Sequence, residues 1–217
     1  MPHDDLIGRL EAVLLAHDDG ADASHDINHA RRVMHTALRI AAREGGGDED
    51  AIIAAAYLHD WVNLPKNHPD RAQASRLSAE AARPILAVLG FSTERIAATC
   101  HAIAAHSFSA NIQPQTLEAR ALQDADRLEA LGAIGLARVF AIAGQLGTSL
   151  FDGEDPFARN RPLDDRRFAV DHFAVKLLRL PKTMQTASGR AMAEERAEVL
   201  RRYLRSLADE VGSEMPW

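Results

Sequence analysis

The chain has little cysteine and few aromatic residues. Cys100 is the only cysteine among 217 residues, so the chain can form neither an internal disulfide nor a thiolate zinc site. Aromatic residues make up only 5% of a chain that is 47% hydrophobic, and many of the apolar residues are alanines. Small apolar residues favour closely packed helices over a strand-rich sandwich. We therefore expect an all-α protein in a reducing, cytoplasmic environment.

Long apolar runs and an excess of positive charge are also lacking. No stretch of about 18 apolar residues is present that would span a bilayer. The first residues, 1–5, have neither the basic start nor the apolar run of a secretory signal. We therefore expect a soluble protein with no membrane partner. The formal net charge of -6 opposes a general attraction to nucleic acid, but it leaves room for a small basic pocket around one phosphorylated ligand.

Apolar residues recur at helical spacing through most of the chain, and the length suits one domain. Pro84 is expected to kink or divide its helix, and Gly132 and Gly135 are expected to interrupt theirs. Between the last long helices, residues 144–165 contain several turn-forming glycines and prolines, which predicts a long excursion that acts as a lid or a partner-binding loop. The expected helices cover residues 4–17, 24 or 26 to 44, 48–60, 75–89, 92–103, 116–143, 166–180 and 188–210.

An acidic residue, Asp126, occurs where the helix periodicity calls for an apolar side chain. Leu122, Ala125 and Ala130 surround it at helical spacing. Burying a carboxylate without a partner is costly, so we expect Asp126 to meet a cation. That cation is either an arginine, such as the neighbouring Arg127, or a bound metal ion, and Asp126 alone does not distinguish the two.

The dipeptide His59-Asp60 follows an apolar helix at the point where the helix meets a loop. Adjacent side chains can converge there, because a continuing helix no longer fixes their directions. A His-Asp pair alone is a weak signal, since it is also typical of a helix-terminal cap and since His25-Asp26 forms a second such pair. Considered together with Asp126, the pair favours a metal site.

The ordered set His29, His59-Asp60 and Asp126 resembles the metal-binding signature of the HD-domain phosphohydrolase superfamily. Over roughly residues 6–210 the chain resembles one branch of small bacterial HD hydrolases. The resemblance implies an HD-domain helical bundle that forms a single domain over 1–217, with a metal-binding core at about 24–131 and a C-terminal elaboration at about 144–210. The segments that carry it are SHDINHARRV (24–33), LHD (58–60), HAIAAHS (101–107) and DADRLEALGA (124–133).

The resemblance also implies that two imidazoles and two carboxylates bind one divalent metal. The matching positions are His29, His59, Asp60 and Asp126. Such ligands leave open positions in an octahedral shell, which suits manganese, magnesium, iron, nickel or cobalt, and zinc is a further candidate. A metal with open positions can activate water and polarise a phosphoryl oxygen. We expect Asp60 or Asp126 to orient that water through its second oxygen.

His101 and His106 occupy the interval in which related two-metal HD enzymes place additional histidines. Five residues on a straight helix separate them by about 140°, so both can face one site only if the helix ends or unwinds between them. We expect one of them to contact the substrate phosphate or to protonate the leaving group. A second metal is the alternative, and a plain cation at a helix C-terminus is another for His106.

Three cations lie near the expected site in the sequence. Arg32, Lys66 and Arg127 are candidates for binding a substrate phosphate. Each residue type is more often an ordinary surface cation, and the sequence does not decide between these roles.

The function implied by the resemblance is hydrolysis of a small phosphorylated metabolite, with a nucleotide as the favoured class. Cleavage of a phosphomonoester, of a pyrophosphate or of a cyclic nucleotide remain alternatives. Residues 61–64 lack the acidic side chains that follow the His-Asp pair in the branch that cleaves guanosine tetraphosphate, which disfavours that activity. A noncatalytic module that binds metal and nucleotide is the alternative from another class. The acidic balance disfavours a nucleic-acid hydrolase, and a homo-oligomer is left open.

Overall fold

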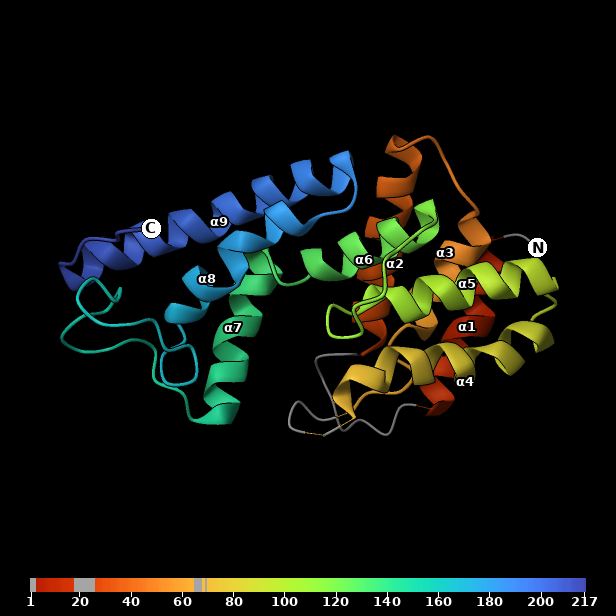
Figure 1. Ribbon diagram of the computed structural model, residues 1–217, viewed down its shortest axis with the longest axis horizontal. Helices are drawn as coiled ribbons and strands as arrows, with labels where there is room; N and C mark the ends of the chain where they lie inside the picture. Colours follow the sequence, from red (N-terminus) through yellow and green to blue (C-terminus); the bar gives the residue numbers. More distant parts are fainter. Residues whose placement is uncertain (1–2, 18–25, 65–67, 69) are drawn as a thin grey trace. The chain divides into compact units, whose positions relative to one another are not determined.

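The computed structural model is all-α, which confirms the expected fold class, and it describes residues 3–17, 26–64, 68 and 70–217 (Figure 1). Within these residues no strand forms, and only Ser149 and Phe168 make an isolated bridge. The chain divides into two compact units, Met1–Asp126 and Arg127–Trp217. No single described helix is long and apolar enough to span a membrane, whereas α6 (Leu117–Leu128) and α7 (Gly132–Leu146) meet that test of length and composition only as a bent pair.

The first unit contains six α-helices and a short 3-10 helix, η1, in the part of it that the structure describes. Three of the α-helices begin at capping side chains, because Asp26, Asp48 and Ser92 each accept a hydrogen bond from a backbone N–H three residues later. The elements are α1 (His3–His17), α2 (Ile27–Arg43), α3 (Glu49–Leu58), η1 (Arg71–Gln73), α4 (Ala74–Val88), α5 (Thr93–His106) and α6 (Leu117–Leu128).

Helix α3 is the centre of the first unit. Every residue from Ala51 to Leu58 is buried, and α3 contacts α1, α2, α4 and α5. Each fully buried Ile or Leu of this helix contributes about 1.5–3 kcal/mol relative to an exposed position. Because α3 is apolar on all sides, its C-terminal end lies in the interior of the unit. The residues that follow it therefore lie close to the neighbouring helices.

The second unit contains α7 (Gly132–Leu146), α8 (Asp171–Val175), η2 (Leu177–Thr183) and α9 (Ala187–Val211). Helix α9 contacts both α7 and η2. Phe140, Phe173 and Tyr203 from three of these helices pack with ring centroids 5.5–6.2 Å apart. The expected helix at 166–180 is therefore wrong in extent, because α8 has only five residues and continues into a 3-10 helix.

Two expected interruptions differ from the structure. Pro84 does not divide its helix: α4 continues through it, and Pro84 is exposed, so water can replace the backbone hydrogen bond that proline cannot donate. The expected helix at 116–143 does break, but the break lies between Leu128 and Gly132, and Gly135 lies inside α7. Gly132 has φ +69, and a Cβ there would meet Arg196 Cγ at 3.2 Å, so glycine is required at the start of α7.

The excursion at 144–165 is packed into the second unit. Asp155 accepts hydrogen bonds from the backbone N–H groups of Arg159 and Asn160, which folds the segment back on itself. Phe157 is fully buried. Arg161 donates two hydrogen bonds to Asp171, which is also fully buried. These contacts do not support the lid interpretation of this segment.

Candidate metal centre

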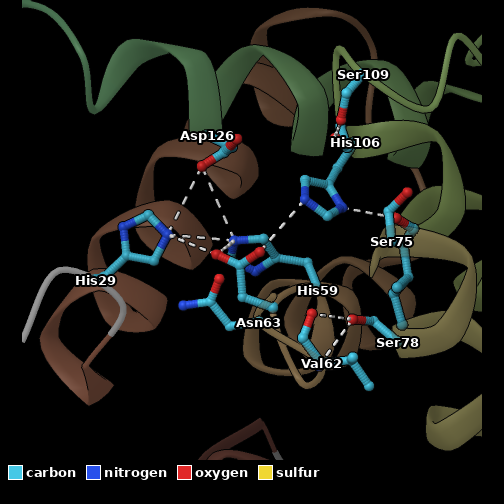
Figure 2. Close-up of polar contacts among 12 residues, drawn as sticks. His29, His59, Val62, Asn63, Ser75, Ser78, His106, Ser109 and Asp126 are labelled. Carbon is cyan, nitrogen blue, oxygen red and sulfur yellow. Dashed lines mark hydrogen bonds and ion pairs between the residues drawn. The ribbon is translucent and has the colours of Figure 1, made fainter. Parts of the chain in front are cut away.

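Four side chains from three separate parts of the sequence converge in the first unit (Figure 2). His29 comes from the first turn of α2, His59 and Asp60 follow the end of α3, and Asp126 lies in the last turn of α6. The Nε2 atoms of His29 and His59 are 3.2 Å apart. Asp60 Oδ2 lies 3.2 Å from His59 Nε2 and 3.7 Å from His29 Nε2. Asp126 Oδ1 lies 3.6 and 3.9 Å from the same two nitrogens.

The backbone orients the His59 imidazole. His59 is the C-cap of α3, and its Nδ1 lies 2.8 Å from the carbonyl oxygen of Ala56, three residues earlier. Because a carbonyl only accepts, Nδ1 carries the proton and donates it, which leaves Nε2 with a lone pair when the ring is neutral. His59 therefore presents a ligand atom to His29, Asp60 and Asp126.

His106 repeats this arrangement on the other side of Asp60. It is the last residue of α5, its Nδ1 donates to the Ile103 carbonyl at 2.7 Å, and its Nε2 lies 3.5 Å from Asp60 Oδ1. The rings of His59 and His106 meet edge to face with centroids 4.8 Å apart. Asp60 thus directs Oδ2 toward the first group and Oδ1 toward His106, so two overlapping groups of potential metal ligands share His59.

The imidazoles are buried, whereas the carboxylates reach solvent. His29, His59 and His106 are 2%, 2% and 6% exposed, but the side chains of Asp60 and Asp126 are 26% and 30% exposed. The cluster is therefore closed on the histidine side and open on the carboxylate side. A ligand from solution would approach the cluster over Asp60 and Asp126.

The electrostatics of the cluster show that it attracts positive charge. Burial disfavours the charged form of His59, yet the Asp60 and Asp126 carboxylates and the hydrogen bond to the Ala56 carbonyl together outweigh burial and raise the pKa of His59 to about 9. Burial acts on Asp60 in the opposite sense, but the His59 and His106 imidazoles hold the pKa of Asp60 well below its usual range. The carboxylates thus retain a proton on His59 at neutral pH, and a metal cation can take the place of that proton.

The donor set and its spacing fit a divalent metal. Two ligands that are each about 2.1 Å from one ion lie about 3.0 Å apart at a right angle and about 4.2 Å apart when opposite. The separation of 3.2 Å between the two imidazoles and those of 3.2–3.9 Å between each imidazole and each carboxylate fall within this range, and His29, His59 and Asp126 form one group of potential metal ligands. Every ion pair of Asp126 among the described residues is with an imidazole, so the arginine interpretation of Asp126 is not what the structure shows.

The structure places His101 away from this cluster. Helix α5 is continuous from Thr93 to His106, so the five-residue separation directs the two histidines to different sides. His101 Nε2 accepts a hydrogen bond from Gln115 N at 3.0 Å, and His101 lines a separate hollow between α4 and α5. The expectation that His101 acts in the same site is therefore not supported, because α5 does not unwind before His106.

The three expected phosphate-binding cations have different environments. Arg32 is half-buried on α2, one turn after His29. Arg127 belongs to the second unit, where its Nη1 donates to the Thr183 carbonyl at 2.5 Å. Lys66 lies outside the described residues. Asn63 lies beside the cluster in Figure 2.

Sequence reasoning missed the groups that orient the two histidines. Both are backbone carbonyls, of Ala56 and Ile103, and each lies three residues before the histidine that it fixes. The available signal was the position of His59 and His106 at helix C-termini, where the last carbonyls have no partner within the helix. Sequence reasoning also missed a contact that holds the loop after Asp60. Val62, two residues after Asp60, donates a backbone hydrogen bond to Ser78 Oγ at 2.9 Å.

Comparison with known proteins identifies the fold family. The model of the HD domain matches residues 26–131, which include all five residues of the cluster. The chain is 33% identical over 193 residues to the Bacillus subtilis protein YpgQ, and the match covers 87% of this chain and 85% of YpgQ. The chain belongs to the HD-domain superfamily. The expected family is thereby confirmed, and the cluster lies within the part of the chain that matches the HD domain.

Solved HD-domain structures match nearly the whole chain. A crystal structure of B. subtilis YpgQ in complex with ADP superposes with a TM-score of 0.74 at 31% identity, covering 97% of both chains. A crystal structure of an HD-superfamily hydrolase from Bacillus thuringiensis superposes with a TM-score of 0.75 at 28% identity, covering 97% of this chain and 99% of the other. This HD-domain protein is therefore similar to HD-superfamily hydrolases over both of its units.

Proposed function

We propose that this HD-domain protein is a metal-dependent phosphohydrolase that acts on a small phosphorylated metabolite, in particular a nucleotide. The observation that carries the proposal is that one oxygen of each carboxylate lies 3.2–3.9 Å from both imidazole Nε2 atoms, in a cluster that opens on its carboxylate side. A divalent metal is the ligand that this mixed nitrogen and oxygen set favours. His29, His59, Asp60 and Asp126 would hold it.

A bound divalent metal would supply an acidified water and a positive charge that polarises a phosphoryl oxygen. The chain's own residues position the reacting groups. His29 and His59 close the cluster from the buried side, so the substrate phosphate is directed to the exposed side, where Asp60 and Asp126 lie. Asp60 can also orient a water molecule through Oδ1, the oxygen that faces His106.

His106 is the candidate for proton transfer to the leaving group. Its Nδ1 is committed to the Ile103 carbonyl, and its Nε2 is 3.5 Å from Asp60 Oδ1. The His106 Nε2 atom, from which a proton would be transferred, therefore lies next to Asp60, one of the proposed metal ligands. The alternative for His106 is a ligand to a second metal, which the overlapping group His59, Asp60 and His106 accommodates.

The nucleotide class is supported by the similarity to YpgQ, whose crystal structure contains ADP. Opening of the cluster to solvent on the carboxylate side suits a substrate whose phosphate enters while the rest of the molecule stays outside. Monoester cleavage, pyrophosphate release and cyclic-nucleotide opening all require attack on phosphorus at such a site, and the substrate panel below distinguishes them.

The test is a screen of the purified chain after its bound metal has been identified by elemental analysis. Nucleoside mono-, di-, tri- and cyclic phosphates are supplied with Mn²⁺, Mg²⁺, Co²⁺, Ni²⁺, Fe²⁺ or Zn²⁺, and phosphate or pyrophosphate release is measured. We expect activity with at least one metal and one nucleotide class. His59→Ala and Asp60→Ala are each expected to abolish the activity and to reduce the amount of metal that the chain retains.

The matched control is His35→Ala. His35 is an exposed histidine on α2, the helix that carries His29, so its removal changes the histidine content without touching the cluster. Activity that survives both His59→Ala and Asp60→Ala would contradict the proposal. A chain that retains metal and binds ADP but hydrolyses none of the panel would instead establish the noncatalytic module.

A further inference from the structure

A pair of stacked aromatic rings includes the residue that directly follows Asp60. The rings of His17 and Trp61 are nearly parallel, with centroids 3.9 Å apart and an interplanar angle of 9°. His17 is the last residue of α1, and Trp61 belongs to the loop after α3. The chain has only two tryptophans among its 217 residues, and one of them therefore stands next to a proposed metal ligand.

The loop that carries Trp61 runs along the metal centre. Asp60, directly before Trp61, belongs to the cluster, and Asn63, two residues after Trp61, lies beside it (Figure 2). The Asp60 side chain is 26% exposed and Asn63 is exposed, so this loop lies on the side from which a ligand would approach. The hydrogen bond from Val62 N to Ser78 Oγ fixes the loop in this position.

A hydrogen bond holds the two rings together. His17 Nε2 lies 3.0 Å from the Trp61 carbonyl oxygen. Because a carbonyl only accepts, Nε2 carries a proton and donates it. The contact joins the C-terminal end of α1 to the loop after Asp60, and α1 packs against α3, which delivers that loop. The stack is therefore arranged before any ligand binds, so little conformational freedom would be lost on binding.

The stack ends at the protein surface. Trp61 is half-buried and His17 is exposed. Since Trp61 covers one face of the His17 ring, the exposed surface of that ring is its other face and its edge. The ring pairs of the second unit are covered more completely, because they are formed by buried or half-buried side chains: Phe140, Phe157, Phe173, Tyr203 and Trp217. The stack of His17 on Trp61 thus presents an aromatic surface to solvent.

We propose that the exposed ring of His17, supported by Trp61, stacks against the base of a nucleotide whose phosphates lie at the metal centre. The inference rests on the proposed function, because it places those phosphates beside Asp60. One sugar separates the base of a nucleotide from its first phosphate, and the Cα atoms of Asp60 and Trp61 are about 3.8 Å apart, so one nucleotide can contact both places. Stacking on an aromatic side chain typically strengthens binding by about 10- to 100-fold per base.

The experiment compares two ligands of the full, magnesium-loaded chain by titration calorimetry. One is α,β-methylene ADP, whose bridging carbon resists cleavage between the phosphorus atoms, and the other is methylenediphosphonate, which lacks the base and the sugar. We expect α,β-methylene ADP to bind at least about 10-fold more tightly. In a Trp217→Phe chain, Trp61 is the only tryptophan. Its fluorescence should fall on saturation with α,β-methylene ADP and change little with methylenediphosphonate.

Two substitutions of His17 separate the aromatic ring from the hydrogen bond. His17→Asn keeps a donor for the Trp61 carbonyl but removes the ring, and it should weaken binding of α,β-methylene ADP by about 10-fold. His17→Phe keeps an aromatic face without the donor and should retain most of the affinity. Neither variant should alter binding of methylenediphosphonate. The matched control is His35→Ala, which removes an exposed histidine of α2 and should leave both affinities unchanged.

Equal affinities for the two ligands, or no binding of α,β-methylene ADP, would overturn the proposal. It would also be overturned if His17→Asn bound α,β-methylene ADP as tightly as the unaltered chain, or if His17→Phe lost as much affinity as His17→Asn. Because no turnover is needed, these outcomes differ from failure of the phosphohydrolase proposal. That failure would appear as absence of hydrolysis across the nucleotide panel, with the dependence of nucleotide binding on the His17 ring intact.

Discussion

Both units of this protein hold carboxylates beside cationic or titratable partners, but they satisfy them differently. In the second unit, Asp171 is fully buried and accepts two hydrogen bonds from Arg161 and one from Asp164 N, at 2.5–2.9 Å. In the first unit, Asp60 and Asp126 face imidazoles and stay partly open to solvent. A carboxylate that is paired with an arginine, which is always charged, stabilises the fold. A carboxylate that is paired with histidines can instead help to bind a metal ion, because the metal can replace the proton on the imidazole.

The largest expected effect is the loss of the metal centre. Asp126→Asn keeps the size of the side chain but removes the negative charge and one ligand oxygen. We expect hydrolysis to fall to background and the metal content to drop, while the free energy of unfolding of the metal-free chain changes little because Asp126 is 30% exposed. Activity assays, elemental analysis and urea unfolding measure the three quantities. Full metal content in Asp126→Asn would remove Asp126 from the ligand set.

Asp171→Asn is expected to show the reverse pattern. It leaves the Arg161 guanidinium without its charged partner, and breaking a buried ion pair in this way costs about 3–5 kcal/mol of unfolding free energy. Denaturant unfolding monitored by circular dichroism would measure the loss. Metal bound per folded molecule should be unchanged. If Asp171→Asn were as stable as the unaltered chain, the contrast between the two carboxylate environments would be wrong.

A smaller effect is expected from His106, with His101 as its matched control on the same helix. His106→Asn removes the proposed proton donor and should lower kcat by about 100-fold, the lower end of the range for general acid catalysis. His101→Asn removes only the acceptor for Gln115 N, so about 1 kcal/mol of stability is lost and kcat is retained. Steady-state kinetics and thermal melts separate the two outcomes. Equal losses of kcat in both variants would contradict the assignment of His106.

The smallest effect is a pH dependence of the metal-free chain. The pKa of His59 is raised from 6.5 to about 9, so its protonation stabilises the fold fully below pH 6.5 and that contribution is lost as the pH rises through about 9. We expect the Tm of the chelated protein to decline over this window. The manganese-loaded protein should show no such decline, because the metal replaces the proton, and His59→Asn should abolish it in the chelated protein. A decline that persists in His59→Asn would assign it to another group.

The metal centre was predictable from the sequence further than its surroundings were. His59-Asp60 and Asp126 stood out because polar side chains occupied positions at the end of, or within, apolar helical patterns. Their convergence followed from the resemblance to the HD-domain superfamily, since helix periodicity says nothing about which helices meet. The buried helix α3 that delivers His59 and Asp60 was also predicted closely, because its apolar run leaves little alternative to burial.

The parts that were missed depend on contacts between distant residues. The interruption at Gly132 was expected, but the approach of Arg196 Cγ to 3.2 Å from the position of a Cβ there is a contact that no local pattern reports. The excursion at 144–165 contains the glycines and prolines of a loop, and only the pairing of Arg161 with Asp171 and the burial of Phe157 reveal that it is packed.

Helix α6 has one more consequence, for dissecting the protein. The boundary between the two units falls directly after Asp126, whereas α6 continues to Leu128. A shortened chain that stopped at the boundary would end on a proposed metal ligand, in a helical turn that frays and next to a new terminal carboxylate. Such a fragment would lose metal affinity even if every other ligand were in place. A cut placed after Leu131 would keep the whole of α6 and the three residues that follow it.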